Sequence, residues 1–177
     1  MSKIAGRLSF HDALKHYSGK NPAKLMVIGA GAAGLSAAHE AVKCGVPVQL
    51  LGRHEHLRSE LEDVGISFCP LPQSEQISFI KNYLSDKTLV ITAARTSGKK
   101  APILLDEESL TLLPHHAVVV DLAISNGGNV VGSKHDHVIS VAHGVSIVNI
   151  SGYPKTEPRS SSEAYAQCAY SLLTAIM

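Results

Sequence analysis

Residues 25–34 read LMVIGAGAAG, an apolar run that leads directly into three glycines with the spacing G-x-G-x-x-G. In a strand–turn–helix unit the first glycine permits the tight turn, and the second allows backbone N–H groups to approach a pyrophosphate. The third lets the helix lie close against the strand. Because an Ala-rich stretch suited to a helix follows, the pattern predicts dinucleotide binding rather than a simple packing turn.

The helix predicted after this turn begins near residue 32, so its N-terminus faces the same turn. The partial positive charge at a helix N-terminus and its free N–H groups favour a bound phosphate. The predicted phosphate-binding residues are therefore Gly29, Gly31, Ala32, Ala33 and Gly34.

Length and composition describe an ordinary globular chain. With 177 residues the chain is long enough for one well-buried core. A net charge of +1 gives no electrostatic footprint for nucleic acid or for an anionic membrane. No apolar stretch reaches the roughly 18 residues of a membrane span, and no secretory signal is evident. Three cysteines without metal-ligand spacing indicate buried or free thiols in a reducing cytoplasm.

Strand and helix patterns alternate along almost the whole chain, which predicts a Rossmann-like α/β fold with a doubly wound, mostly parallel sheet flanked by helices. We expect one domain over residues 1–177, with an N-terminal helix and linker at 1–22 and a closing C-terminal helix at 160–177. Strands are predicted at residues 24–29, 46–51, 66–69, 88–92, 117–122, 138–141 and 145–150. Helices are predicted at residues 2–17, 32–44, 54–64, 75–84, 106–113 and 160–176.

The second predicted strand lacks the acidic residue that usually accepts the ribose hydroxyls of NAD. Residues 50–54 read LLGRH, so Gly52, Arg53 and His54 stand at that position. A small residue followed by Arg suits a 2′-phosphate, which favours NADP over NAD. The alternatives are a solvated Arg53 with no group left to bind the ribose, or a shifted register in which Glu55 supplies the carboxylate.

Further cofactor contacts are expected where later strands end, because a doubly wound sheet opens its crevice at the carboxyl ends of its strands. Thr92, Ala93 and Ala94 end the fourth predicted strand, and Leu122 ends the fifth. Asn129 is suited either to a hydrogen bond with a nicotinamide carboxamide or to capping its own turn.

The ten histidines do not predict a metal site. The neighbours His115 and His116 point to opposite faces of an extended chain, and His135 and His137 lack further converging ligands. His143 precedes a glycine and is explained equally well by a turn. No Ser–His–Asp or Cys–His arrangement can be assembled from the predicted fold, so no catalytic residue is assigned.

Four segments resemble the nucleotide-binding half of the alanine dehydrogenase and pyridine nucleotide transhydrogenase family. They are MSKIAGR, VIGAGAAGLSAAHEAVKCGVPV, TAARTSGKKAPILLDEESL, and VVVDLAISNGGNV with AHGVSIVNISGYP. The TA…GK.AP and VDLA…GGN pairings are more specific than the glycines alone, and the resemblance is nearer to the transhydrogenase alpha subunit than to alanine dehydrogenase. It implies a structural, hydrogen-bonding role for Asp121. Lys99 and Lys100 either belong to a solvated face, as most exposed lysines do, or contact a partner subunit, as the resemblance implies.

The chain also departs from that family in ways that bear on activity. We expect a chain without the family's N-terminal domain; residues 69–88 are shorter than in the family, and Ser125 stands where alanine dehydrogenases place a catalytic Asp. We therefore expect a domain that binds NAD or NADP without complete catalysis alone. The alternative is a working transhydrogenase component that exchanges hydride with a dinucleotide on a partner subunit. A homodimer is expected because the apolar stripe of helix 2–17 lacks its covering domain.

Overall fold

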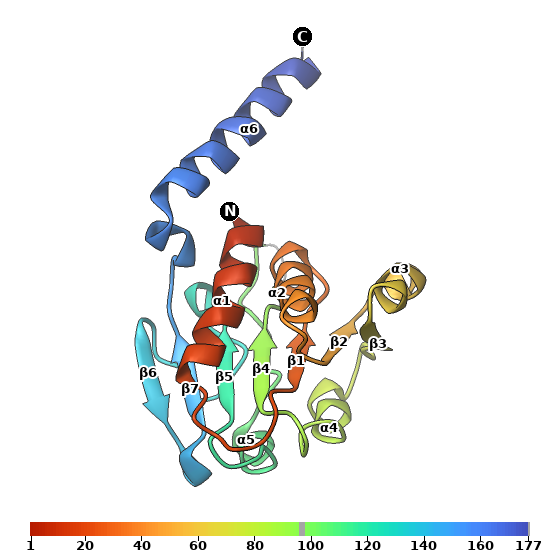
Figure 1. Cartoon of the computed structure of the whole chain (residues 1–177), viewed down its shortest axis with the longest axis vertical. Helices are drawn as coiled ribbons and strands as arrows, with labels where there is room; N and C mark the ends of the chain where they lie inside the picture. Colours follow the sequence, from red (N-terminus) through yellow and green to blue (C-terminus); the bar gives the residue numbers. More distant parts are fainter. Residues whose placement is uncertain (96–97, 177) are drawn as a thin grey trace.

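Seven strands form one sheet in the order β3-β2-β1-β4-β5-β7-β6, in a computed structural model that describes residues 1–95 and 98–176 (Figure 1). All neighbouring strands are parallel except β6 and β7. The strands are β1 (Leu25–Ile28), β2 (Val48–Gly52), β3 (Ile66–Pro70), β4 (Leu89–Thr92), β5 (Val118–Asp121), β6 (His137–Ser140) and β7 (Ser146–Asn149). The predicted Rossmann-like α/β fold is confirmed.

The helices are α1 (Ser2–His16), α2 (Ala32–Lys43), α3 (Arg58–Asp63), α4 (Gln76–Lys81), α5 (Glu107–Thr111) and α6 (Pro158–Ile176). Helices α1 and α2 cover one face of the sheet, and α4 and α5 cover the other. Short 3-10 turns are η1 (Glu55–Leu57), η2 (Ile124–Asn126), η3 (Ala142–Gly144) and η4 (Tyr153–Thr156). None of the helices in the described part of the chain is long and apolar enough to cross a membrane.

The central strands are apolar at every position because each contributes side chains to two cores. In β1, Leu25 and Val27 pack with residues of α1 and α2 in one core. Met26 and Ile28 point to the opposite face and pack with residues of α4 and α5 in the second. Successive side chains of a strand alternate between faces, so a sheet covered on both sides requires such a run.

The strand order reverses between β1 and β4. From β1 the chain continues outward to β2 and β3, whereas β4, β5 and β7 follow on the other side. In open α/β sheets, ligands bind in the crevice at the carboxyl ends of the strands beside such a reversal. The fold therefore directs the search for a site to the ends of β1 and β4.

The first helix is covered within the chain, contrary to our expectation. Helix α1 lies against α2, and Phe10 and Ala13 on its inner side are fully buried. Gly6 permits this approach, since a β-carbon there would lie 1.9 Å from the carbonyl oxygen of Ala33. The predicted exposed stripe is thus wrong, and it gives no reason for a homodimer.

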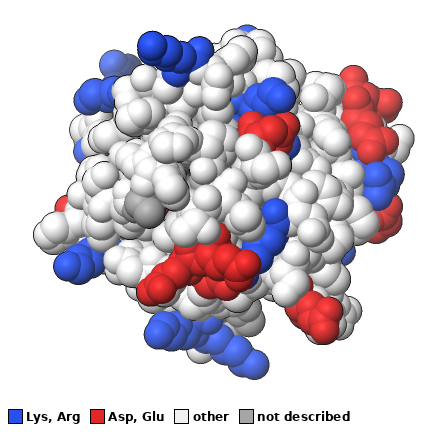
Figure 2. All heavy atoms as spheres, turned by 90° about the horizontal axis from the view of Figure 1, so that it is seen from below, with Lys and Arg blue, Asp and Glu red and all other residues white. Residues whose placement is uncertain are grey.

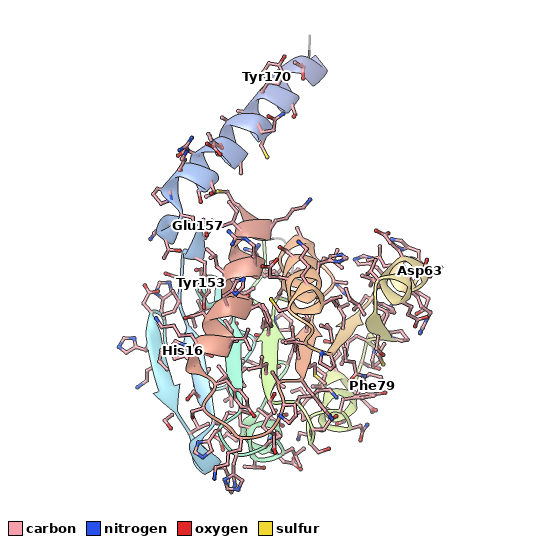
Figure 3. The ribbon with its side chains drawn as sticks, viewed as in Figure 1. His16, Asp63, Phe79, Tyr153, Glu157 and Tyr170 are labelled. Carbon is pink, nitrogen blue, oxygen red and sulfur yellow. The ribbon has the colours of Figure 1, made fainter. Side chains whose placement is uncertain are left out.

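The C-terminal helix forms but does not close the domain. Helix α6 follows η4 and projects away from the sheet (Figure 1), and the side chains of Tyr165 and Tyr170 are 70% and 65% exposed. The turn before it is held to α1, because the Tyr153 hydroxyl donates to Asp12 (2.8 Å) and Arg7 pairs with Glu157 (2.6 Å) (Figure 3). These contacts hold the start of α6 against α1, and the rest of the helix extends away from the sheet.

One other helix also differs from its predicted form. The segment expected as one helix over residues 54–64 is divided into η1 and α3.

On the face of the molecule seen from below in Figure 2, opposite the carboxyl ends of the parallel strands, acidic and basic side chains are interspersed.

Candidate functional site

A cavity of about 630 Å³ lies at the carboxyl ends of the parallel strands, beside the strand reversal. It contains most of the residues that the sequence assigned to a cofactor. These are Gly29, Gly31, Ala32, Ala33, Gly52, Arg53, His54, Ala93, Ala94 and Leu122. The cavity unites the ends of β1, β2, β4 and β5, as expected for a doubly wound sheet.

Gly29 allows the chain to turn sharply out of β1. Its φ of +116° is one that residues with a side chain rarely adopt. A β-carbon at Gly29 would also lie 2.9 Å from the carbonyl carbon of Ala93, at the end of the neighbouring strand. The first glycine therefore provides both the turn and the close approach of β1 to the segment after β4.

The other two glycines have different physical roles. A β-carbon at Gly34 would lie 1.9 Å from the carbonyl oxygen of Gly29, so this glycine lets α2 pack against the turn. Gly34 does not line the cavity. Gly31 has an ordinary φ of −82°, and a β-carbon there would meet nothing within 4 Å. The space in front of Gly31 is thus open to a ligand.

The N-terminus of α2 faces the cavity without a competing group. Gly31 is the N-cap and has no side chain to bond the first N–H groups, and the first turn of α2 carries no acidic residue. These N–H groups lack partners within their own helix. Together with the open space at Gly31, they fit a phosphate or another anion.

At the end of β2 the structure explains why no carboxylate stands in the ribose position. A β-carbon at Gly52 would lie 2.6 Å from the β-carbon of Ala30 and 3.2 Å from Cε2 of Phe68. A side chain could enter there only if its neighbours moved. Glu55 does not take over this role, because its carboxylate accepts a 2.6 Å hydrogen bond from Arg58 and does not line the cavity.

Thr92 does not contact the cavity, which corrects one of our assignments. Its side chain is fully buried, and its hydroxyl is 3.5 Å from the carbonyl oxygen of Val120 and 3.3 Å from Oδ1 of Asp121. Thr92 is the last residue of β4, and its side chain points into the sheet. The following residues, Ala93 and Ala94, form the cavity wall instead.

Asp121 has the structural role that the resemblance implied. One of its carboxylate oxygens accepts from the backbone N–H of Ala123 (2.9 Å), and the other from those of Asn129 (2.8 Å) and Val130 (3.2 Å) and from the hydroxyl of Ser133 (3.1 Å). Burial raises the pKa of the Asp121 carboxyl, and these hydrogen bonds oppose that rise. The carboxylate thus holds residues 123–133 against the end of β5.

Asn129 stabilises a loop and has no amide proton left for a ligand. Its Oδ1 accepts from the N–H of Ala94 (3.1 Å), and its Nδ2 donates to the carbonyl oxygens of Ala94 (3.0 Å) and Pro102 (2.7 Å). The side chain is fully buried and does not line the cavity. In this structure the side chain of Asn129 thus holds the loop and does not reach the cavity, so the other predicted role, in the turn itself, fits its contacts.

Several residues of the cavity wall were missed from the sequence. They are Met1, Ser2, Ala5, Ala30, Leu71, Gln73, Gln76, Arg95, Pro102, Ile124, Ser125 and residues 150–154. Leu71 and residues 150–154 directly follow β3 and β7. The rule that parallel strands end at the crevice would have found these two groups, had it been applied to every predicted strand.

No cluster of three or more metal-binding side chains occurs within residues 1–95 and 98–176. The rings of His115 and His143 lie 5.0 Å apart in an edge-on arrangement, close to the residue that precedes β5. That position is at the amino end of β5, whereas the cavity lies at the carboxyl ends of the strands. The histidines of this pair therefore take no part in the candidate site.

The fold and the cavity define a Rossmann-like domain whose glycine turn opens onto a cavity, and comparisons with known proteins specify its family. The model of the alanine dehydrogenase/PNT C-terminal domain matches residues 12–177. The chain is 27% identical to the first section of NAD(P) transhydrogenase subunit alpha of Rickettsia prowazekii, over 98% of this chain and 53% of that protein. It is 30% identical to alanine dehydrogenase of Staphylococcus haemolyticus, over 93% of this chain and 48% of that protein.

A solved structure gives the same result. Transhydrogenase from Sinorhizobium meliloti superposes with a TM-score of 0.87 at 29% identity, covering 97% of this chain and 54% of that one. The chain belongs to the family of the alanine dehydrogenase/PNT C-terminal domain. It spans about half the length of the relatives that it matches.

Replacing Asp121 by Asn tests the buried network. The amide would point an N–H₂ group at backbone N–H donors that now face a carboxylate oxygen, so we expect a loss of about 3 kcal/mol in the free energy of unfolding. Urea denaturation measures this loss. Asp63→Asn, at the exposed end of α3 (Figure 3), is the matched control and should change stability by less than about 0.5 kcal/mol. Equal stability of the two variants would contradict the role given to Asp121.

Proposed function

We propose that this chain is an NAD(P)-binding domain that holds a dinucleotide with its pyrophosphate against the N-terminus of α2. The observation that carries the proposal is the open space at Gly31, in front of uncapped helix N–H groups. A pyrophosphate needs such N–H groups and cannot approach past a side chain. The names of the relatives, NAD(P) transhydrogenase and alanine dehydrogenase, support the same ligand class.

We further propose that NADP is preferred over NAD. No Asp or Glu is among the described residues that line the cavity, and Gly52 leaves no carboxylate to accept the ribose hydroxyls. Arg53 follows directly, and its guanidinium can pair with both oxygens of a 2′-phosphate. His54 lines the same cavity, and its ring can offer a further N–H donor.

The proposed domain binds a dinucleotide without completing a reaction by itself. In hydride transfer the reacting ring belongs to the cofactor, whereas the protein supplies orientation and electrostatics. The described residues that line the cavity include Arg53, His54 and Arg95, but no carboxylate or thiol that would suit acid–base or nucleophilic catalysis. Ser125 supplies a hydroxyl at the wall of the cavity and cannot replace a carboxylate base.

The alternative is a working component of an NAD(P) transhydrogenase, which passes hydride to or from a dinucleotide on a partner subunit. The names and similarity of the transhydrogenase relatives favour it. The two functions differ in a simple assay, because only the second predicts hydride transfer between NADH and an NADP analogue when an NADP-binding partner subunit is added.

A cytoplasmic homodimer also belongs to the proposal. The three cysteines are free thiols, which suits a reducing compartment. Because α1 is covered, the surface that we propose for self-association is α6, whose described side chains are mostly exposed. Light scattering of the purified chain gives its mass in solution, and a monomer at all concentrations would exclude the dimer.

Two alanine substitutions in the glycine turn separate binding from folding. Gly31→Ala places a methyl group in the open space, so the free energy of unfolding should change by less than about 1 kcal/mol while dinucleotide affinity falls at least about tenfold. Gly34→Ala forces a backbone contact and should cost about 3 kcal/mol of stability. Calorimetric titration and urea denaturation measure the two quantities. Unchanged affinity in Gly31→Ala would contradict pyrophosphate binding at this turn.

Removing the guanidinium of Arg53 tests the preference for NADP. In Arg53→Ala we expect NADP affinity to fall about tenfold and NAD affinity to change less than about twofold, because only NADP carries the 2′-phosphate. Titration of NAD, NADH, NADP and NADPH into both proteins measures this. Arg159→Ala, an equally simple loss of one arginine at the start of α6, is the control. A preference for NADP that survives in Arg53→Ala would show that another group recognises the phosphate.

A further inference from the structure

We propose that Arg95 recognises a carboxylate at the pyridine end of the bound dinucleotide, so that the cavity accepts a ligand with negative groups at both ends. This inference rests on the proposed dinucleotide binding. It concerns the part of the cavity at the end of β4, whereas the proposed 2′-phosphate contact of Arg53 lies at the end of β2.

The pairing of the arginines is the observation that leads to this proposal. The chain has five arginines. Arg7, Arg58 and Arg159 each pair with at least one glutamate, with N–O distances of 2.6 to 3.1 Å. Arg53 and Arg95 line the cavity, and among the described residues neither pairs with a carboxylate. The two arginines at the cavity thus differ from the other three, because neither pairs with a carboxylate among the described residues.

The fold places these two arginines on opposite sides of the glycine turn. Arg53 follows β2 and Arg95 follows β4, and β1 with its glycine turn lies between these strands in the sheet. In a doubly wound sheet the ribose contact at the end of β2 belongs to the adenosine half of a dinucleotide. Arg95 therefore belongs to the other half, where the pyridine ring would lie.

The backbone before Arg95 is fixed in a way that an ordinary surface loop does not require. The side chain of Asn129 bonds both the N–H and the C=O of Ala94, and it also bonds the C=O of Pro102. Asn129 is itself held through its N–H by the buried Asp121. The buried amide of Asn129 thus anchors the backbone at Ala94 and at Pro102. It therefore fixes the backbone position from which Arg95 follows.

The chemistry around Arg95 suits a carboxylate better than a neutral amide. A guanidinium offers two parallel N–H groups that match the two oxygens of a carboxylate, whereas a carboxamide has one acceptor oxygen. Ser125, on η2 after β5, lines the same cavity and adds a hydroxyl without negative charge. No acidic residue among the described lining residues would repel such a ligand.

The carboxylate could come from two sources. It could be attached to the pyridine ring itself, as in the nicotinic acid form of the dinucleotide. It could also belong to a small 2-oxo acid bound beside the ring. Both present the same group to Arg95, and the experiment separates them.

The test is a set of titrations with the full chain. In the first arm, the affinities of NAD and NADP are compared with those of their nicotinic acid analogues. In the second arm, NADPH is titrated with and without saturating oxamate, which has the carboxylate of a 2-oxo acid but accepts no hydride. We expect about tenfold tighter binding of the nicotinic acid analogues if the ring carries the group, or about tenfold tighter binding of NADPH in oxamate if a separate acid does.

Two variants identify the residue responsible. Arg95→Ala should abolish whichever gain in affinity is observed, while the affinity for NADP changes less than about threefold. Arg95→Lys should retain part of the gain in affinity, because it keeps the charge but not the paired donors. Arg53→Ala should show the opposite behaviour, losing the preference for NADP and keeping the carboxylate gain.

Three results would overturn the inference or its basis. The absence of a gain in both arms would overturn it, and so would a gain that persists in Arg95→Ala. If neither NAD nor NADP binds the chain, the proposed function itself is contradicted and the inference falls with it. If both dinucleotides bind without regard to a carboxylate, the proposed function stands and only the role of Arg95 is refuted.

Discussion

The contact between Gly34 and Gly29 is the constraint on which the rest of the site depends. With a β-carbon position only 1.9 Å from a carbonyl oxygen, no residue but glycine permits α2 to lie this close to the end of β1. That position directs the first turn of α2 into the cavity, and the open space at Gly31 exposes its N–H groups. A packing requirement inside the protein therefore creates the geometry on which the proposed phosphate contact depends.

The other half of the cavity is organised by polar groups that never touch it. Asp121 and Asn129 are both fully buried, and they connect the end of β5 to Ala94 and Pro102 in the wall. Buried polar groups are tolerated only when they are paired, and paired networks of this kind fix one arrangement. The carboxylate of Asp121 is occupied by hydrogen bonds to residues 123–133 and does not line the cavity. The described residues of the cavity wall include no Asp or Glu.

The sequence predicted the fold and the glycine turn well because both depend on local patterns: apolar strands, helix signals and glycine spacing. It did not show that the polar side chains of Thr92 and Asn129 turn into the protein, because the direction of a side chain at a strand end depends on its neighbours. It also placed a closing helix at residues 160–177, where α6 projects outward instead. The sequence does not show that Arg7 pairs with Glu157, 150 residues away. For the same reason it does not show which arginines lack a carboxylate partner among the described residues.

The charge balance of the cavity follows from these two features together. Arg53 and Arg95 line the same cavity as the first residues of α2, and no acidic residue among the described lining residues offsets their charge. Placing a ligand over them removes water, and an unpaired charge then carries a desolvation cost. A ligand that offers negative groups to both arginines replaces that water, whereas one with only a pyrophosphate leaves one or both unpaired. Selectivity in such a site comes from protein charges that only a sufficiently anionic ligand can satisfy.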